Sequence, residues 1–121
     1  DNAETEANAA ARYNALAGRN SGALAMSAIN FTNSQFWNAV IYCRDLSATA
    51  AVAMDGNTST TYTDWRIPTF DELMAFGNIT ESANLWTSTP GTTVGSIIYT
   101  NMLGQWGEQA AGGGTFVRCV R

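Results

Sequence analysis

The spacing of apolar residues predicts a helix in the second quarter of the chain. Apolar residues recur at helical intervals after a capping residue, Asn33 or Ser34, and continue to about Leu46. The expected apolar face of this helix consists of Phe36, Trp37, Val40, Ile41 and Cys43.

A second helix has the clearest start signal in the sequence. Thr69 and Glu72 have the spacing of a capping box, in which each side chain bonds to the other residue's backbone. Pro68 keeps the residue before it extended, so the helix is expected to begin after Thr69. Its apolar face is expected to contain Leu73, Met74 and Phe76, with Gly77 at its end.

Strand-like patterns dominate the last third of the chain. Short strands are expected at residues 85–88, 96–103 and 115–120, and an earlier one at 23–29. Polar residues 55–64 are typical of a surface loop. Because the helices come early and the strands late, the chain favours an α+β fold with a mainly antiparallel sheet.

An alanine-rich segment precedes these elements. Residues 1–18 are expected to form a short N-terminal helix, followed by one domain at 19–121. Ala3, Ala10 and Ala17 recur every seven residues, as in the seam of a coiled-coil stalk. Packing of this helix against its own domain explains the pattern equally well.

Composition narrows the classes of function. The 121 residues include ten acids and six basic residues, all arginine, so the net charge of −4 disfavours nucleic-acid or polybasic membrane binding. Histidine is absent, which excludes Ser–His and Cys–His catalysis and histidine-bound metal. No apolar run reaches the roughly 18–20 residues that span a bilayer. We therefore expect no enzymatic activity, cofactor, metal, nucleic-acid partner or membrane insertion.

Cys43 and Cys119 are the only cysteines in the sequence. Their spacing fits neither a CxxC redox pair nor a four-ligand zinc site. A structural disulfide is the favoured interpretation, and a reactive thiol or half of a metal site are the alternatives. A disulfide belongs to an oxidising compartment, which favours a secreted or surface location.

Four sequence blocks, in order, carry a resemblance to a protein family. The blocks are Cys43-Arg44-Asp45-Leu46, Trp65-Arg66-Ile67-Pro68-Thr69 with Glu72-Leu73, Trp86-Thr87-Ser88-Thr89 and Val117-Arg118-Cys119-Val120-Arg121. Together they resemble the C-terminal domain family of the Legionella collagen-like adhesin, bacterial domains with a C-type-lectin-like fold. The resemblance covers residues 33–121.

This resemblance implies two helices around a small twisted sheet, long loops as the recognition surface, and a Cys43–Cys119 disulfide. Members that cap fibrous stalks are trimeric adhesins. We accordingly expect a non-enzymatic extracellular domain at the tip of a bacterial or phage surface fibre. It would bind a cell-surface glycan or protein as a homotrimer. The alternative is a structural trimerisation or capping module with no ligand of its own.

The block that begins at Trp65 is expected to be structural. Trp65 and Ile67 would face the core, while the planar guanidinium of Arg66 suits a buried carboxylate. Glu72, Asp71 and Asp45 are all candidates for that carboxylate, and the sequence does not choose among them.

Two other binding modes are disfavoured. The acid-Pro-Asn and Trp-Asn-Asp strings of calcium-dependent C-type lectins do not occur. The acidic net charge opposes capture of sulfated polysaccharides, although a local arginine patch from Arg118, Arg121 or Arg19 could still bind them.

The main candidate for ligand binding is a tryptophan in the segment from Asn101 to Thr115. Trp106 offers a flat apolar face among amide and acid groups, which suits a sugar ring or a protein surface. The alternative is that Trp106 packs inward. Loops 89–96 and 57–62 are secondary candidates. The predicted ligand-binding residues are Trp106, Gln105, Glu108, Asn101, Thr92 and Tyr62.

Overall fold

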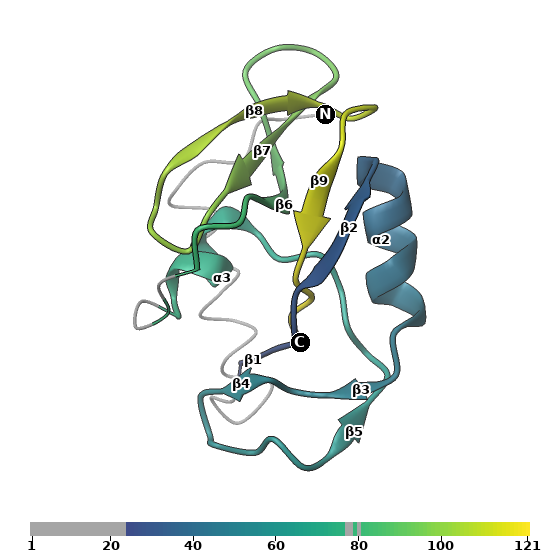
Figure 1. Cartoon of the computed structure of the whole chain (residues 1–121), viewed down its shortest axis with the longest axis vertical. Helices are drawn as coiled ribbons and strands as arrows, with labels where there is room; N and C mark the ends of the chain where they lie inside the picture. Colours follow the sequence, from purple (N-terminus) through teal and green to yellow (C-terminus); the bar gives the residue numbers. More distant parts are fainter. Residues whose placement is uncertain (1–23, 77–78, 80) are drawn as a thin grey trace.

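A computed structural model of the chain describes residues 24–76, 79 and 81–121 and confirms the α+β class (Figure 1). The helix predicted at residues 1–18, with its coiled-coil seam, lies outside the described residues. In the described part of the chain, strands predominate over two short helices. The elements are β1 (Ala25–Met26), β2 (Asn30–Ser34), α2 (Phe36–Asp45), β3 (Ala48–Thr49), β4 (Val52–Ala53), β5 (Thr61–Tyr62), α3 (Phe70–Met74), β6 (Leu85–Pro90), β7 (Ser96–Thr100), β8 (Trp106–Ala110) and β9 (Thr115–Val117).

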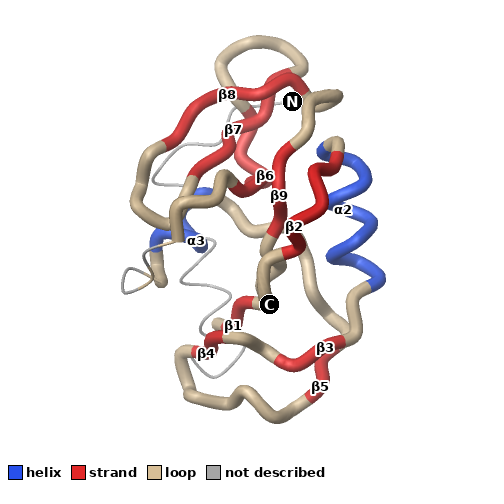
Figure 2. The backbone as a smooth tube through the Cα atoms, viewed as in Figure 1, coloured by secondary structure: helices blue, strands red, loops and turns tan. Residues whose placement is uncertain are grey.

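Five strands form one curled sheet that resembles half of a barrel (Figure 2). Their order is β2-β9-β6-β7-β8, and only the β6–β9 pair in this sheet is parallel. The sheet is therefore mixed, although antiparallel pairing predominates as expected. Two small antiparallel ribbons, β1–β4 and β3–β5, lie at the other end of the molecule (Figure 1). Among the described residues, no helix is long and apolar enough to cross a bilayer.

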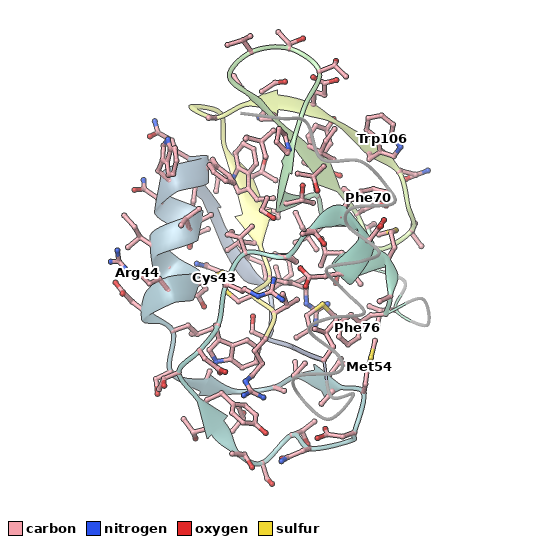
Figure 3. All side chains as sticks on the ribbon, turned by 180° about the vertical axis from the view of Figure 1, so that it is seen from behind. Cys43, Arg44, Met54, Phe70, Phe76 and Trp106 are labelled. Carbon is pink, nitrogen blue, oxygen red and sulfur yellow. A yellow bond between two sulfur atoms is a disulfide. The ribbon has the colours of Figure 1, made fainter. Side chains whose placement is uncertain are left out.

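Helix α2 packs against β2 and β9 with three of the five predicted residues, Phe36, Val40 and Cys43, but with neither Trp37 nor Ile41. Phe36, Ala39 and Cys43 are buried, whereas Trp37 and Ile41 are 67% and 44% exposed. The small Ala39 side chain allows close packing, and Cys43 points inward while Arg44 points outward (Figure 3). The burial of Cys43 fixes which side of the helix faces the core.

The predicted cap of α2 is also wrong. Asn33 and Ser34 belong to β2, because their strand pairs with β9. The helix begins after Gln35, whose side chain makes no capping bond. The Phe36 N–H donates instead to the Ala111 carbonyl at 2.9 Å, so a distant turn caps the helix.

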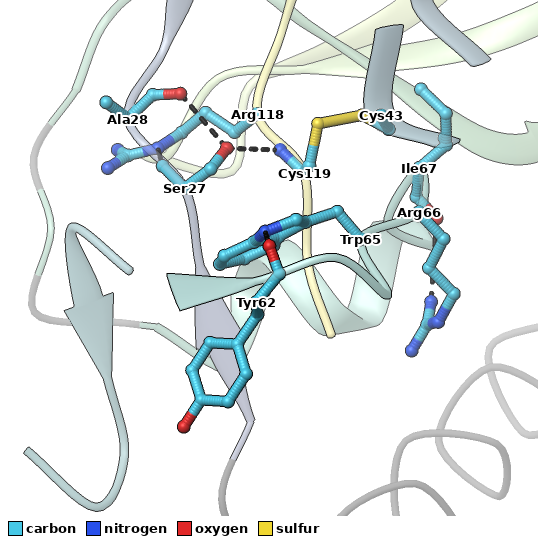
Figure 4. Close-up of a disulfide and its surroundings, with 9 residues drawn as sticks. All are labelled: Ser27, Ala28, Cys43, Tyr62, Trp65, Arg66, Ile67, Arg118 and Cys119. Carbon is cyan, nitrogen blue, oxygen red and sulfur yellow. Dashed lines mark hydrogen bonds between the residues drawn. A yellow bond between two sulfur atoms is a disulfide. The ribbon is translucent and has the colours of Figure 1, made fainter. Parts of the chain in front are cut away.

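The disulfide between Cys43 and Cys119 is confirmed, with the two Cα atoms 5.5 Å apart. Both residues are fully buried, and the Trp65 indole lies beside them in the same core cluster (Figure 4). The reactive-thiol and metal-ligand alternatives are thereby excluded for this pair. Cys119 follows β9 and does not lie within it; its N–H donates to the Ser27 hydroxyl at 2.8 Å.

The capping box of α3 is confirmed. The Glu72 N–H donates to the Thr69 hydroxyl at 3.2 Å, and the Thr69 N–H donates to the Glu72 carboxylate at 2.7 Å. The same carboxylate pairs with both terminal nitrogens of Arg66, at 2.8 and 2.5 Å, which selects Glu72 from the three candidate acids. Trp65 and Ile67 are buried, as predicted.

Several element boundaries differ from the predictions. Helix α3 ends before Ala75 and does not reach Gly77. Strand β8 occupies residues expected to be loop, because its backbone pairs with β7 over five residue pairs. The strands predicted at 23–29, 96–103 and 115–120 are shorter in the structure, and the one predicted at 85–88 is longer. Strand β5 lies inside the loop predicted at 55–64. These differences arise because strand ends depend on pairing with distant strands.

Candidate functional site

The six predicted ligand-binding residues do not form a single cluster. Strand β5, which carries Tyr62, lies at the opposite end of the molecule from β8, which carries Trp106 (Figure 1). The Arg121 guanidinium covers the Tyr62 ring at 3.6 Å from its centre, and that guanidinium also pairs with Asp64 at 2.5 Å. Tyr62 is therefore part of a packed cation–π contact.

Trp106 lies on the surface beside α3. Its side chain is 59% exposed, and its ring meets Phe70 edge to face at a centroid distance of 6.4 Å (Figure 3). The alternative that Trp106 packs inward is therefore wrong, while ligand binding by Trp106 stays a prediction.

Asn101 and Gln105 stabilise the turn between β7 and β8. The Asn101 side-chain oxygen accepts from the N–H groups of Leu103 and Gln105, and its amide donates to the Gln105 side chain at 2.8 Å. Asn101 is only 4% exposed. The oxygen and the nitrogen of its side-chain amide are already hydrogen-bonded within the turn, so they have little capacity to bind a ligand.

Glu108 and Thr92 are brought together, but they bond to each other. The exposed Glu108 carboxylate accepts from the hydroxyls of Ser96 and Thr92, both at 2.7 Å, and from the N–H groups of Thr92 and Thr93. The Ser96 and Thr92 hydroxyls lead in lowering the pKa of Glu108 to about 2. The carboxylate thus holds the loop between β6 and β7 in place.

The two arginines of the described residues that could have formed a basic patch are engaged in other contacts. Arg118 is 7% exposed and donates to the Ser27 carbonyl at 3.0 Å, while Arg121 pairs with Asp64. Arg19 lies outside the described residues. Within the described part of the chain, no three acidic or cysteine side chains gather as a metal site would require.

A groove of about 230 Å³ lies instead between the two edges of the curled sheet. The edge strands β2 and β8 both contribute to it, as do β7, β9 and the residue before β6. The curl of the sheet brings these strands close together. The lining residues are Asn33, Asn84, Tyr99, Gln109, Gly114, Thr115 and Phe116.

Strand geometry explains how Tyr99 and Gln109 enter the groove. Tyr99 pairs with Gly107, and Ile97 pairs with Gln109, so Tyr99 and Gln109 project from the same side of the β7–β8 ladder. Side chains alternate along a strand, so Trp106 projects from the other side of β8. The groove and the Trp106 surface are therefore separate candidate sites.

Glycines position two of the groove side chains. A Cβ atom on Gly107 would lie 2.6 Å from the Tyr99 hydroxyl oxygen, and one on Gly113 would lie 2.6 Å from the Gln109 amide nitrogen. The missing Cβ atoms therefore leave the space that the phenol ring and the carboxamide occupy. A Cβ atom on Gly112 would contact nothing within 4 Å, so this neighbour has no such role.

The polar groups of the groove are largely unpaired. Among the described residues, the side-chain amides of Asn33 and Asn84 and the Tyr99 hydroxyl make no hydrogen bond. Gln109 makes one long bond, from its amide nitrogen to the Gly114 carbonyl at 3.4 Å. These groups can each exchange a water for a ligand atom without breaking an internal bond.

Aromatic carbon forms the apolar part of the groove. The Tyr99 ring supplies this carbon. Phe116 also borders the groove and is half-buried, but it pairs with Leu85, which pairs with Thr100, so its ring projects from the face of the sheet opposite to the Tyr99 ring. There it packs against the core cluster that contains Leu85 and meets the Phe31 ring edge to face at 5.5 Å. Phe31 is 64% exposed, so this aromatic contact lies outside the groove. The described lining residues are all uncharged.

Sequence reasoning missed this groove because its residues come from five separate segments. Asn33 was expected as a helix cap, and Tyr99 and Phe116 as ordinary strand residues. The molecule is an α+β domain whose curled sheet carries a small, neutral, amide-lined groove. It matches no protein-family profile, no curated protein sequence and no solved structure.

Proposed function

We propose that the protein is a non-enzymatic extracellular recognition domain that binds a sugar ring in the groove between the sheet edges. The observation that carries this proposal is the combination of unpaired amide and hydroxyl groups with the Tyr99 ring in one groove. Sugars present hydroxyls that both donate and accept, as carboxamides do, and C–H faces that pack on aromatic carbon.

The size of the groove supports a small ligand. Sites for drug-sized molecules measure roughly 300–1,000 Å³, so about 230 Å³ suits one terminal sugar ring. A site of this size gives weak binding, which several copies of the domain would strengthen through avidity.

The broader setting follows from the family resemblance and belongs to the same proposal. The domain would be C-type-lectin-like and would form the tip of a trimeric surface fibre. The buried Cys43–Cys119 disulfide suits an oxidising, extracellular environment. Sedimentation of the intact chain tests the trimer independently of ligand binding.

A glycan array tests the binding function, with two single variants that separate the candidate sites. We expect Tyr99→Ala, in the groove, to abolish binding, and Trp106→Ala, on the other side of β8, to retain it. The reverse pattern would place the site at Trp106. Absence of binding to every glycan on the array, by folded wild-type protein, would overturn the function.

A further inference from the structure

We propose that the groove selects an uncharged sugar that carries an acetamido group; this inference rests on the proposed sugar-binding function. The acetamido group of such a sugar contains one N–H donor, one carbonyl acceptor and one methyl group. The groove offers complements to all three.

Carboxamides supply the polar complement. Asn33, Asn84 and Gln109 each carry an acceptor oxygen and a donor nitrogen in one plane. One carboxamide can therefore pair with a ligand amide through two hydrogen bonds, whereas a lone sugar hydroxyl occupies one. The groups on Asn33 and Asn84 make no internal hydrogen bond, so neither must be released first.

Aromatic carbon supplies the apolar complement. The half-buried Tyr99 ring gives the acetyl methyl group and the sugar ring a surface to pack on. The missing side chain of Gly107 leaves the space that this ring occupies.

The charge of the groove excludes acidic and amino sugars. Neither cationic nor anionic side chains occur among its described lining residues. A carboxylate or ammonium group that entered the groove would lose water without gaining a charged partner, which is unfavourable. An acetylated amine avoids this loss because it is neutral.

Titration of the isotopically labelled protein with methyl β-glycosides tests the proposal. The probes are N-acetylglucosamine, glucose, glucosamine and glucuronic acid glycosides, and the observed signals are the side-chain amide resonances of Asn33, Asn84 and Gln109. We expect the N-acetylated probe to bind about tenfold more tightly than glucose, because it adds hydrogen bonds to a carboxamide and a methyl contact. The two charged probes should bind more weakly than glucose.

Two pairs of variants connect the preference to the groove. Asn84→Asp removes the amide donor with little change in shape and should abolish the N-acetyl preference, whereas Asn38→Asp on exposed α2 should preserve it. Gly113→Ala displaces Gln109 and should weaken binding severalfold, whereas Gly112→Ala should not. Each variant's amide spectrum reports whether it is folded.

The possible results separate this inference from the function on which it rests. Equal affinity for glucose and N-acetylglucosamine would overturn the ligand class and leave sugar binding intact. No response to any probe, together with a negative array, would overturn the sugar-binding function itself. Tight binding of the acidic probe would contradict the charge argument.

Discussion

At the scale of single residues, the ion pair between Arg66 and the buried Glu72 should make a large contribution to the free energy of unfolding. Glu72 is completely buried, and its carboxylate is satisfied by Arg66 and the Thr69 N–H. Arg66→Ala would leave a buried carboxylate without its main partner, which should lower the free energy of unfolding by about 3 kcal/mol. Urea unfolding measures the change.

The matched control for this variant is another arginine in an ion pair. Arg44 pairs with Asp45 at 2.9 Å, but both side chains are more than half exposed. Arg44→Ala should therefore leave the unfolding midpoint unchanged within error. If Arg66→Ala unfolded at the same urea concentration as wild type, the structural role assigned to Arg66 would be wrong.

Glu108 should respond to acid in a defined range. Its folded-state pKa of about 2 lies below its ordinary value of 4.5, because Ser96, Thr92 and Thr93 donate to its ionised form. Its stabilising effect is therefore complete above about pH 4.5 and is lost as the pH falls toward 2.

An NMR titration of the Glu108 side-chain carboxyl carbon tests this behaviour. We expect a midpoint near pH 2, with the Thr92 and Thr93 amide signals moving in parallel. A midpoint near 4.5 would mean that the carboxylate does not hold the loop.

At the scale of elements, helix α2 provides a sharp test of which face is buried. Phe36 is 8% exposed and packs edge to face on Trp86, whereas its neighbour Trp37 is 67% exposed. Phe36→Ala should lower the free energy of unfolding by about 3–5 kcal/mol. Trp37→Ala should lower it by no more than about 1.5 kcal/mol, because the exposed Trp37 ring loses only its edge-to-face contact with Phe36. Thermal unfolding of both variants measures this; comparable losses would contradict the observed helix orientation.

The elements that were predictable from sequence have local causes. The capping box of α3 depends on Thr69 and Glu72, which are three residues apart, and the structure forms it as expected. The start of α2 depends on Ala111, which lies 75 positions from Phe36, and β8 depends on its pairing with β7. Such long-range hydrogen bonds have no signature in a local window of sequence.

The candidate site was even less predictable from the sequence than the element boundaries. A groove needs the curl of the sheet to bring Asn33 near Gln109, and no periodicity along the chain records that curl. The glycines at 107 and 113 could have been taken as turn formers or as flexible positions. Their role as spaces for Tyr99 and Gln109 became visible only with the side chains in place.

At the scale of the whole molecule, one covalent bond ties helix α2 to the segment that follows β9. Cys43 on α2 and Cys119 near the C-terminus are 76 positions apart, so their bond closes most of the domain into a loop. The chain-entropy argument assigns a loop of this length roughly 4–5 kcal/mol of stabilisation. Small domains have only about 5–15 kcal/mol in total, so this bond decides whether the fold is robust or marginal.

The double variant Cys43→Ala/Cys119→Ala tests that statement without leaving a free thiol. In urea unfolding, the variant should lose roughly 4–5 kcal/mol of the free energy of unfolding. A reducing agent should lower the unfolding midpoint of the wild type and leave that of the variant unchanged. The groove should persist at low temperature, because none of its described lining residues belongs to the buried cluster that contains the two cysteines. Sugar binding should then be retained while the free energy of unfolding falls. An unchanged unfolding midpoint would show that packing around Trp65 and Trp86, and not the covalent bond, holds α2 against the sheet.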